Sequence, residues 1–145
     1  MFKKILIVCI GNICRSPFAE ALLKKNLATS EFDIRSAGLH ALVGHPADEQ
    51  MLAIGDRLSL NMHEHQAQNL KDAHVRWADV ILVMEKTQRQ VLLERFPMAR
   101  GKVFLIHEQR AVPDPYRKTQ EHFDEAAQLL IEACANWTDM LQQQP

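Results

Sequence analysis

The segment CIGNICRS, from Cys9 to Ser16, places a cysteine and an arginine six positions apart around two turn-forming residues. A cysteine thiolate is a strong nucleophile, and the planar fork of an arginine matches two oxygens of a phosphate group. Gly11 and Asn12 can adopt the positive φ of a curled, anion-binding backbone. These residue types predict phosphoryl transfer through a cysteinyl-phosphate, with Cys9 as the nucleophile and Arg15 as the phosphate ligand.

Asp114, in the segment PDPYR, is the candidate for a general acid. A phosphate monoester needs a proton on its leaving oxygen, and the two flanking prolines could hold a carboxyl group over the site. An Asp-Pro pair is equally compatible with a simple turn. Arg117 and Lys118 follow closely, and they either attract an acidic phosphopeptide or form the solvated start of a helix.

The elements that must position these residues alternate between buried strands and helices. Apolar runs predict strands over residues 3–9, 32–38, 78–84 and 102–106, and helices are expected from Pro17 onward and over residues 48–58, 86–95 and 119–141. This alternation predicts an α/β fold in which a four-stranded parallel sheet carries helices on both faces. Cys9 then lies at the carboxyl end of the first strand, where such sheets bind their ligands.

The composition favours one cytoplasmic domain over residues 1–145. A formal net charge of −1 gives no general attraction to nucleic acid. The apolar run of residues 5–10 is too short for a signal peptide or for stable membrane insertion, and the three cysteines are expected to be mostly reduced. His63 and His65 lack a third ligand at a recognisable spacing, so we expect no metal and no cofactor.

The motif VCIGNICRSP, with DPYR more than one hundred positions later, resembles the low-molecular-weight protein tyrosine phosphatases over nearly the whole chain. The resemblance implies the same parallel sheet in a flavodoxin-like three-layer arrangement, and hydrolysis of phosphotyrosine. It also implies that Cys9 is the nucleophile and that Arg15 binds phosphate and stabilises the transition state. Asp114 would act as general acid, and then as base toward the water that hydrolyses the phosphocysteine.

The resemblance assigns further residues to the site. It implies a hydrogen-bond network that holds the loop and tunes the thiolate, made by Asn12, Ser16, Ser36 and His65. It implies phosphate or substrate contacts from the loop, from one wall of the cleft and from an aromatic beside the substrate ring, at Ile10, Gly11, Asn12, Ile13, Cys14, Ser16, Leu39, His40 and Tyr116. Gln68 replaces an arginine that the family often carries, so a contact that depends on that arginine is in doubt.

The wall segment SAGLHALVGHPAD, with Leu39 and Leu42, resembles that of bacterial phosphatases that partner autophosphorylating tyrosine kinases in capsule and exopolysaccharide export. The implied protein substrate is the tyrosine-rich tail of such a kinase. Cys14 has two interpretations: it guards Cys9 through a reversible disulfide, or it fills space under the loop. Cys134 is expected in the core of the last helix.

Rival functions share the phosphate loop. Arsenate reductases of this kind use extra cysteines, whereas residues 58–112 contain none. Protein arginine phosphatases of the family typically have threonine where this chain has Ile13. A cysteine phosphocarrier or a non-catalytic phosphotyrosine-binding module would not need Cys9, Arg15 and Asp114 together.

Overall fold

A four-stranded, entirely parallel sheet forms the centre of the molecule. The computed structural model describes residues 1–28 and 31–145. The strands are β1 (Lys4–Cys9), β2 (Asp33–Gly38), β3 (Val80–Val83) and β4 (Val103–Leu105), in the spatial order β2-β1-β3-β4. The four predicted strands and their parallel pairing are therefore confirmed.

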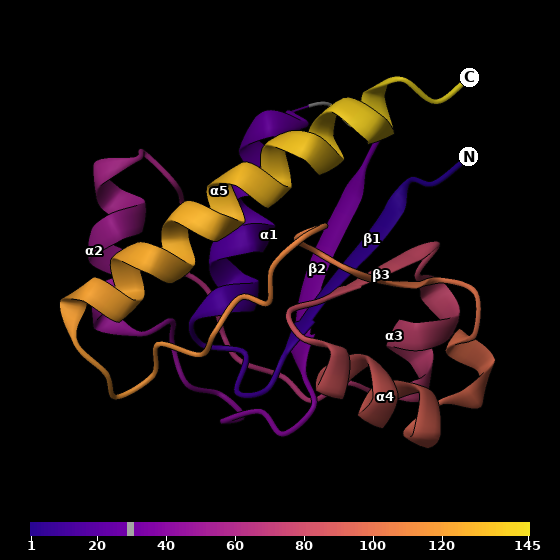
Figure 1. Ribbon diagram of the computed structural model, residues 1–145, viewed down its shortest axis with the longest axis horizontal. Coiled ribbons are helices and arrows are strands. Elements are labelled where there is room, and N and C mark those ends of the chain that lie inside the picture. The colour runs from indigo at the N-terminus through magenta and orange to yellow at the C-terminus, as the bar shows by residue number, and fades with distance from the viewer. Residues whose placement is uncertain (29–30) are drawn as a thin grey trace.

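Helices cover both faces of this sheet (Figure 1). They are α1 (Arg15–Asn26), α2 (Glu49–Arg57), α3 (Asp72–Trp77), α4 (Lys86–Arg95) and α5 (Gln120–Gln142), with a short 3-10 turn, η1 (Pro97–Ala99). Helices α1, α2 and α5 pack on one side, and α3, α4 and η1 pack on the other. The expected three-layer α/β arrangement is confirmed.

The sequence reading missed helix α3. It has six residues, and only Val75 among them is buried, so it carries no apolar stripe that a periodicity search could detect. Helix α1 begins at Arg15, two residues before the expected start, and Pro17 occupies its first turn, where a missing backbone N–H leaves no hydrogen bond unmade.

Strand β1 is buried on both faces, as its continuous apolar sequence predicts. Ile5 and Ile7 pack in the core beneath α1 and α5, and Leu6 and Val8 pack in the core beneath α3 and α4. Cys134 of α5 is fully buried in the first of these cores, as expected, and burial raises the pKa of its thiol. Among the described residues, no helix is both long enough and apolar enough to cross a membrane.

The strand order determines where a ligand can bind. The chain leaves β1 toward β2 on one side and later returns to β3 on the other side of β1. A crevice opens at such a reversal, outside the carboxyl ends of the strands. Cys9 is the last residue of β1 and therefore stands at this edge.

Candidate active site

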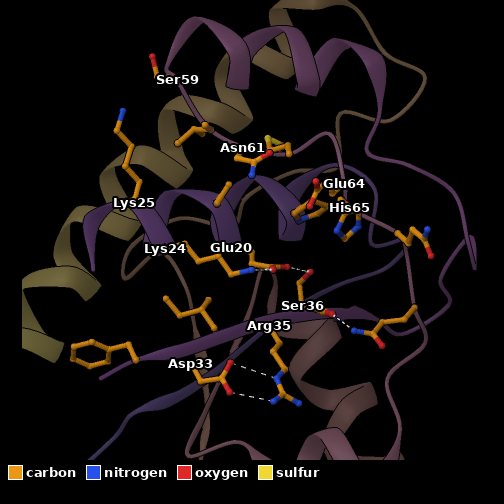
Figure 2. A pocket seen from close by; sticks show the side chains of 18 residues that line it. Glu20, Lys24, Lys25, Asp33, Arg35, Ser36, Ser59, Asn61, Glu64 and His65 are labelled. Atoms are coloured by element: carbon orange, nitrogen blue, oxygen red, sulfur yellow. Dashed lines mark hydrogen bonds and ion pairs between the residues drawn. The ribbon is translucent and has the colours of Figure 1, made fainter. Parts of the chain in front are cut away.

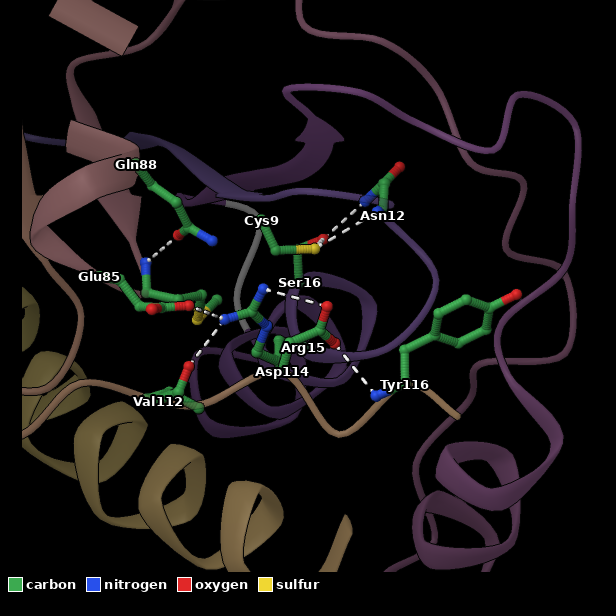
Figure 3. Close-up of polar contacts among 10 residues, drawn as sticks. Cys9, Asn12, Arg15, Ser16, Glu85, Gln88, Val112, Asp114 and Tyr116 are labelled. Carbon is green, nitrogen blue, oxygen red and sulfur yellow. Dashed lines mark hydrogen bonds and ion pairs between the residues drawn. The ribbon is translucent and has the colours of Figure 1, made fainter. Parts of the chain in front are cut away.

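Segments that follow three different strands meet around Cys9 (Figure 3). Residues 10–14 form a loop between β1 and the first turn of α1. Glu85 comes two residues after β3, and Val112 and Asp114 lie in the long segment after β4. Because all the strands are parallel, their carboxyl ends share one edge, which brings residues more than one hundred positions apart into contact.

The carbonyl groups of the loop all point away from its centre. Each of five consecutive carbonyl oxygens contacts a donor of a neighbouring segment: Cys9 with Leu39 N, Ile10 with His40 N, Gly11 with Leu42 N, Asn12 with His65 Nε2 and Ile13 with Asp48 N, at 2.6–3.1 Å. In a trans peptide, the N–H points opposite to the C=O. The following amide N–H groups therefore face inward and form a nest for an anion.

Asn12 allows the loop to curl. Its φ is 58°, in the left-handed region that asparagine tolerates better than most residues, and its amide N lies 3.3 Å from the Sγ of Cys9. The expectation of a positive φ is thus confirmed for Asn12 and wrong for Gly11, which does not adopt a positive φ. One left-handed residue is enough to reverse the direction of this loop.

The side chain of Asn12 is the centre of a buried hydrogen-bond network. Its Nδ2 donates to the Oγ of Ser16 at 2.7 Å and to the Oγ of Ser36 at 3.0 Å. The Oγ of Ser16 also lies 2.9 Å from the Sγ of Cys9. Since Ser16 accepts from Asn12, its own hydrogen is free to be donated to the sulfur, where it stabilises a thiolate.

Three further residues hold this network from behind. The Oγ of Ser36 donates to Glu20, and the Nε2 of His65 donates to the backbone oxygen of Asn12 at 2.6 Å, because a carbonyl can only accept. The backbone N of Gln68 donates to the Oδ1 of Asn12 at 3.0 Å. Since this bond uses the backbone, the contact with Asn12 does not depend on the arginine that Gln68 replaces.

Arg15 is 1% exposed and is held in a fixed orientation. Its Nη1 donates to Glu85 and to the carbonyl of Val112, both at 2.7 Å. Its Nε and Nη2 are buried and make no hydrogen bond within the described residues. Buried donors of a charged group without acceptors are costly, so this edge of the guanidinium suits an oxyanion.

Asp114 lies beside the Nε–Nη2 edge of Arg15. Its Oδ2 is 3.8 Å from the Nη2 of Arg15, and its Oδ1 accepts from the backbone N of Tyr116 at 3.1 Å (Figure 3). The side chain of Asp114 is 43% exposed, so it can exchange protons with solvent. Nucleophile, cation and carboxyl group thus meet at one cavity of about 200 Å³.

A family model described as low molecular weight phosphotyrosine protein phosphatase matches residues 4–145. The chain belongs to this family. The phosphatase is 44% identical to the low molecular weight protein-tyrosine-phosphatase Ptp of Acinetobacter johnsonii over 140 residues, which cover 94% of this chain and 96% of the relative.

Solved structures agree with this assignment. The phosphatase resembles Vibrio vulnificus Wzb in complex with benzylphosphonate, with a TM-score of 0.92, 39% identity and coverage of 97% of this chain and 99% of the other. It also resembles the YwlE arginine phosphatase from Geobacillus stearothermophilus, with a TM-score of 0.90, 30% identity and coverage of 97% and 93%. The fold is thus shared both with Wzb and with a protein named as an arginine phosphatase.

The cavity of the phosphatase contains most of the residues that the sequence assigned to it. It is lined by Cys9, Ile10, Gly11, Asn12, Ile13, Cys14, Arg15, His40, Leu42, Asp114 and Tyr116. Ser16 and Leu39 do not line it. Ser16 is fully buried and contacts the Sγ of Cys9. Leu39 is 9% exposed and packs with Leu6 and Val8 under the sheet, while its carbonyl accepts from Arg95 at 2.7 Å. Leu39 therefore anchors the wall segment, and His40 and Leu42 are the residues of this segment that line the cavity.

Cys14 lies at the base of the loop and is 3% exposed. Burial, together with the negative charges of Asp48, Cys9 and Asp114, raises the pKa of its thiol. A neutral thiol does not compete with Cys9 as a nucleophile. This leaves both interpretations of Cys14, the redox guard and the space-filling side chain, as predictions.

Two acidic residues of this site were missed by sequence reasoning. Glu85 orients Arg15, and Glu20 accepts the hydrogen bond of Ser36. A signal for Glu85 exists, because it directly follows the apolar run VILVM, where a parallel strand delivers residues to the ligand edge. Glu20 lies within a helix, and its sequence context carries no such signal.

A larger pocket of about 990 Å³ lies on the other side of the Asn12 hydrogen-bond network and is lined by Glu20, Ser36 and His65, among others (Figure 2). Its charged side chains are largely paired with one another, Lys24 with Glu20 at 2.6 Å and Arg35 with Asp33 at 3.1 Å. We place the chemistry at the smaller cavity, because that is where the thiol, the Arg15 donors that make no hydrogen bond in the described part of the chain and the carboxyl group of Asp114 converge.

Proposed function

We propose that the chain forms one phosphatase domain that hydrolyses phosphotyrosine through a cysteinyl-phosphate on Cys9. The observation that carries this proposal is the Nε–Nη2 edge of the buried Arg15, which makes no hydrogen bond within the described residues and lines the same cavity as the loop amides and the Sγ of Cys9. These donors match the oxygens of a phosphoryl group, and the thiol lies where it can reach the phosphorus.

In the first step, the Cys9 thiolate attacks the phosphorus in line with the phenolic oxygen. An S–P bond forms, the P–O bond to tyrosine breaks, and Asp114 donates its proton to the leaving oxygen. Arg15 and the loop amides hold the three non-bridging oxygens, whose charge is spread in the transition state. The Asn12–Ser16 hydrogen bond keeps the Ser16 hydroxyl directed at the sulfur.

In the second step, Asp114 is a carboxylate and accepts a proton from water. The water oxygen attacks the phosphorus, the S–P bond breaks, and inorganic phosphate leaves. The sulfur departs as a thiolate, which the Ser16 hydroxyl stabilises. Asp114 is protonated again at the end, so the residues return to their starting states.

The lining of the cavity supports an aromatic substrate. The apolar side chains of Ile13 and Leu42 and the ring of Tyr116 surround the space above the loop. Ile13 also stands where family members that act on phosphoarginine typically have threonine. The similarity to Wzb in complex with benzylphosphonate, in which a methylene group joins the phosphonate to an aromatic ring, supports the same choice.

We further propose that the physiological substrate is the phosphorylated tyrosine-rich tail of a bacterial autophosphorylating kinase involved in capsule or exopolysaccharide production, and that the phosphatase acts in the cytoplasm. The resemblance of its wall segment to that of phosphatases with such partners supports this substrate. Similarity to bacterial relatives named Ptp and Wzb is in line with it.

The decisive experiment compares three peptides of one sequence that carry phosphotyrosine, phosphoserine or phosphoarginine. We expect the highest kcat/KM for phosphotyrosine, no turnover by Cys9→Ser, and a phosphorylated wild-type enzyme that can be trapped by acid quench and detected by mass spectrometry. Circular dichroism controls the folding of Cys9→Ser. Preference for phosphoserine or phosphoarginine would overturn the substrate, and full activity of Cys9→Ser would overturn the nucleophile.

A further inference from the structure

The turn after Asp114 contains an arginine in a strained backbone conformation. The backbone N of Lys118 donates to the carbonyl of Pro115 at 2.9 Å, which closes a turn with Tyr116 and Arg117 at its two central positions. Arg117 has a φ of 63°. A positive φ at this turn position favours glycine, and an arginine there has no local reason to be preferred.

A strained backbone conformation of this kind persists where contacts with the surrounding structure hold it in place. The guanidinium of Arg117 lies 5.3 Å from the centre of the Tyr116 ring, within the range of a cation–π contact. Tyr116 in turn lines the cavity of the phosphatase, and its backbone N is bonded to Asp114. The strained turn thus holds a cation against the aromatic residue that borders the substrate.

Apart from this ring contact, the charge of Arg117 has no partner within the described part of the chain. Arg117 is exposed, and no carboxylate among residues 1–28 and 31–145 forms an ion pair with it. Glu85 and Asp114 face the buried Arg15 instead. A guanidinium stacked on a ring keeps its N–H edge free, and this edge matches a carboxylate in two-point geometry.

We propose that Arg117 is a specificity-determining residue that binds an aspartate or glutamate flanking the phosphotyrosine of the substrate. This inference rests on the proposed function, because a phosphotyrosine in the cavity places its neighbouring residues at the cavity mouth, beside Tyr116. The phosphatase would then prefer acidic sequences, although its net charge of −1 offers no general attraction to them.

The test measures kcat/KM for two phosphotyrosine peptides of otherwise identical sequence. In one peptide both residues flanking the phosphotyrosine are glutamate, and in the other both are glutamine. We expect the wild type to prefer glutamate by about two- to fivefold, the range of an exposed ion pair. This preference should weaken as salt is added. Because each preference is a ratio within one enzyme, partial misfolding of a variant cancels.

Arg117→Gln removes the positive charge and keeps a polar side chain. It should lower the ratio of kcat/KM for the glutamate peptide to that for the glutamine peptide to about one. Lys118→Gln removes a neighbouring exposed charge and is the matched control, for which the wild-type preference should remain. Arg117→Lys keeps the charge without the planar fork and should give an intermediate ratio.

A wild-type ratio of one, or a ratio that Arg117→Gln and Lys118→Gln lower equally, would overturn the role of Arg117 and leave the proposed function intact. If the wild type hydrolyses neither peptide, the proposed function is refuted, and this inference with it. The two failures are therefore distinguishable in one set of measurements.

Discussion

The Nδ2 of Asn12 lies 2.7 Å from the Oγ of Ser16 and donates a hydrogen bond that directs the Ser16 hydroxyl toward Cys9 (Figure 3). Asn12 contributes to the loop in two ways, through its left-handed backbone and through its side-chain amide. Two substitutions separate these contributions. Asn12→Gly keeps the left-handed backbone and loses the side-chain amide, whereas Asn12→Ala loses the amide and also strains the backbone.

We expect Asn12→Gly and Asn12→Ala to lower kcat by a similar factor of about ten or more, because both lose a hydrogen bond that supports a charged group. Asn12→Ala should also lower the free energy of unfolding by about 1 kcal/mol more than Asn12→Gly, since alanine is strained at a positive φ. Steady-state kinetics and urea unfolding measure the two effects. Full activity of Asn12→Gly would show that only the backbone of Asn12 matters.

Replacing Asp114 tests the proton donor. Asp114→Asn should reduce turnover of phosphotyrosine by roughly 10²–10⁴-fold, the usual contribution of a general acid. Aryl phosphates whose phenol leaves readily as an anion should lose much less in the formation of the phosphocysteine. Single-turnover kinetics isolate this step, and equal losses for good and poor leaving groups would rule out the general-acid role.

Gly38, at the end of β2, gives the loop room to approach the sheet. A Cβ at this position would collide with the carbonyl oxygen of Ile10 and lie 3.1 Å from the Cβ atoms of Asn12 and Ala41. Gly38→Ala should therefore lower the free energy of unfolding by about 2 kcal/mol, as overpacking does, and reduce kcat by displacing the loop.

Gly11→Ala is the matched control for stability. Its added Cβ would meet only the Cγ1 of Ile13, at 3.8 Å, and its φ is not positive, so alanine fits without strain. Thermal unfolding of both variants checks the prediction. Equal stability of Gly38→Ala and the wild type would mean that the loop can shift away from the sheet at little cost.

Asp79, just before β3, should make the stability of the fold sensitive to acid. Burial acts to raise the pKa of Asp79, but hydrogen bonds from the backbone N of Lys3 and Lys4, at 3.0 Å, and nearby positive charge lower it below its ordinary 3.8. Because the folded-state pKa is the lower one, this stabilisation is complete well above pH 3.8 and is lost as the pH falls through the folded-state value.

Asp79→Asn should be less stable than the wild type at neutral pH, and the difference should shrink toward acid pH. Urea unfolding across this pH range measures it. A difference that stays constant down to the lowest pH would contradict the assigned role of the Asp79 carboxylate.

Local sequence was sufficient to predict the four strands and their parallel direction, and it indicated an anion-binding loop over residues 9–16. Strand β1 is apolar at every position from Ile5 to Cys9, and a loop followed by a helix N-terminus forms an anion site from neighbouring residues. By contrast, α3 was missed, because a six-residue helix with one buried side chain leaves no periodic signal.

Contacts between distant segments were decided by the tertiary structure alone. The pairing of Arg15 with Glu85 joins residues 70 positions apart, and its geometry follows from the packing of β1 against β3. Leu39 is adjacent to a cavity residue in sequence, yet it points into the core because the sheet needs an apolar side chain there. The groups that can do the chemistry were predictable from residue type, because residue type sets reactivity. The donors of Arg15 that can bind phosphate were not, because they depend on which groups of distant segments pack around the guanidinium.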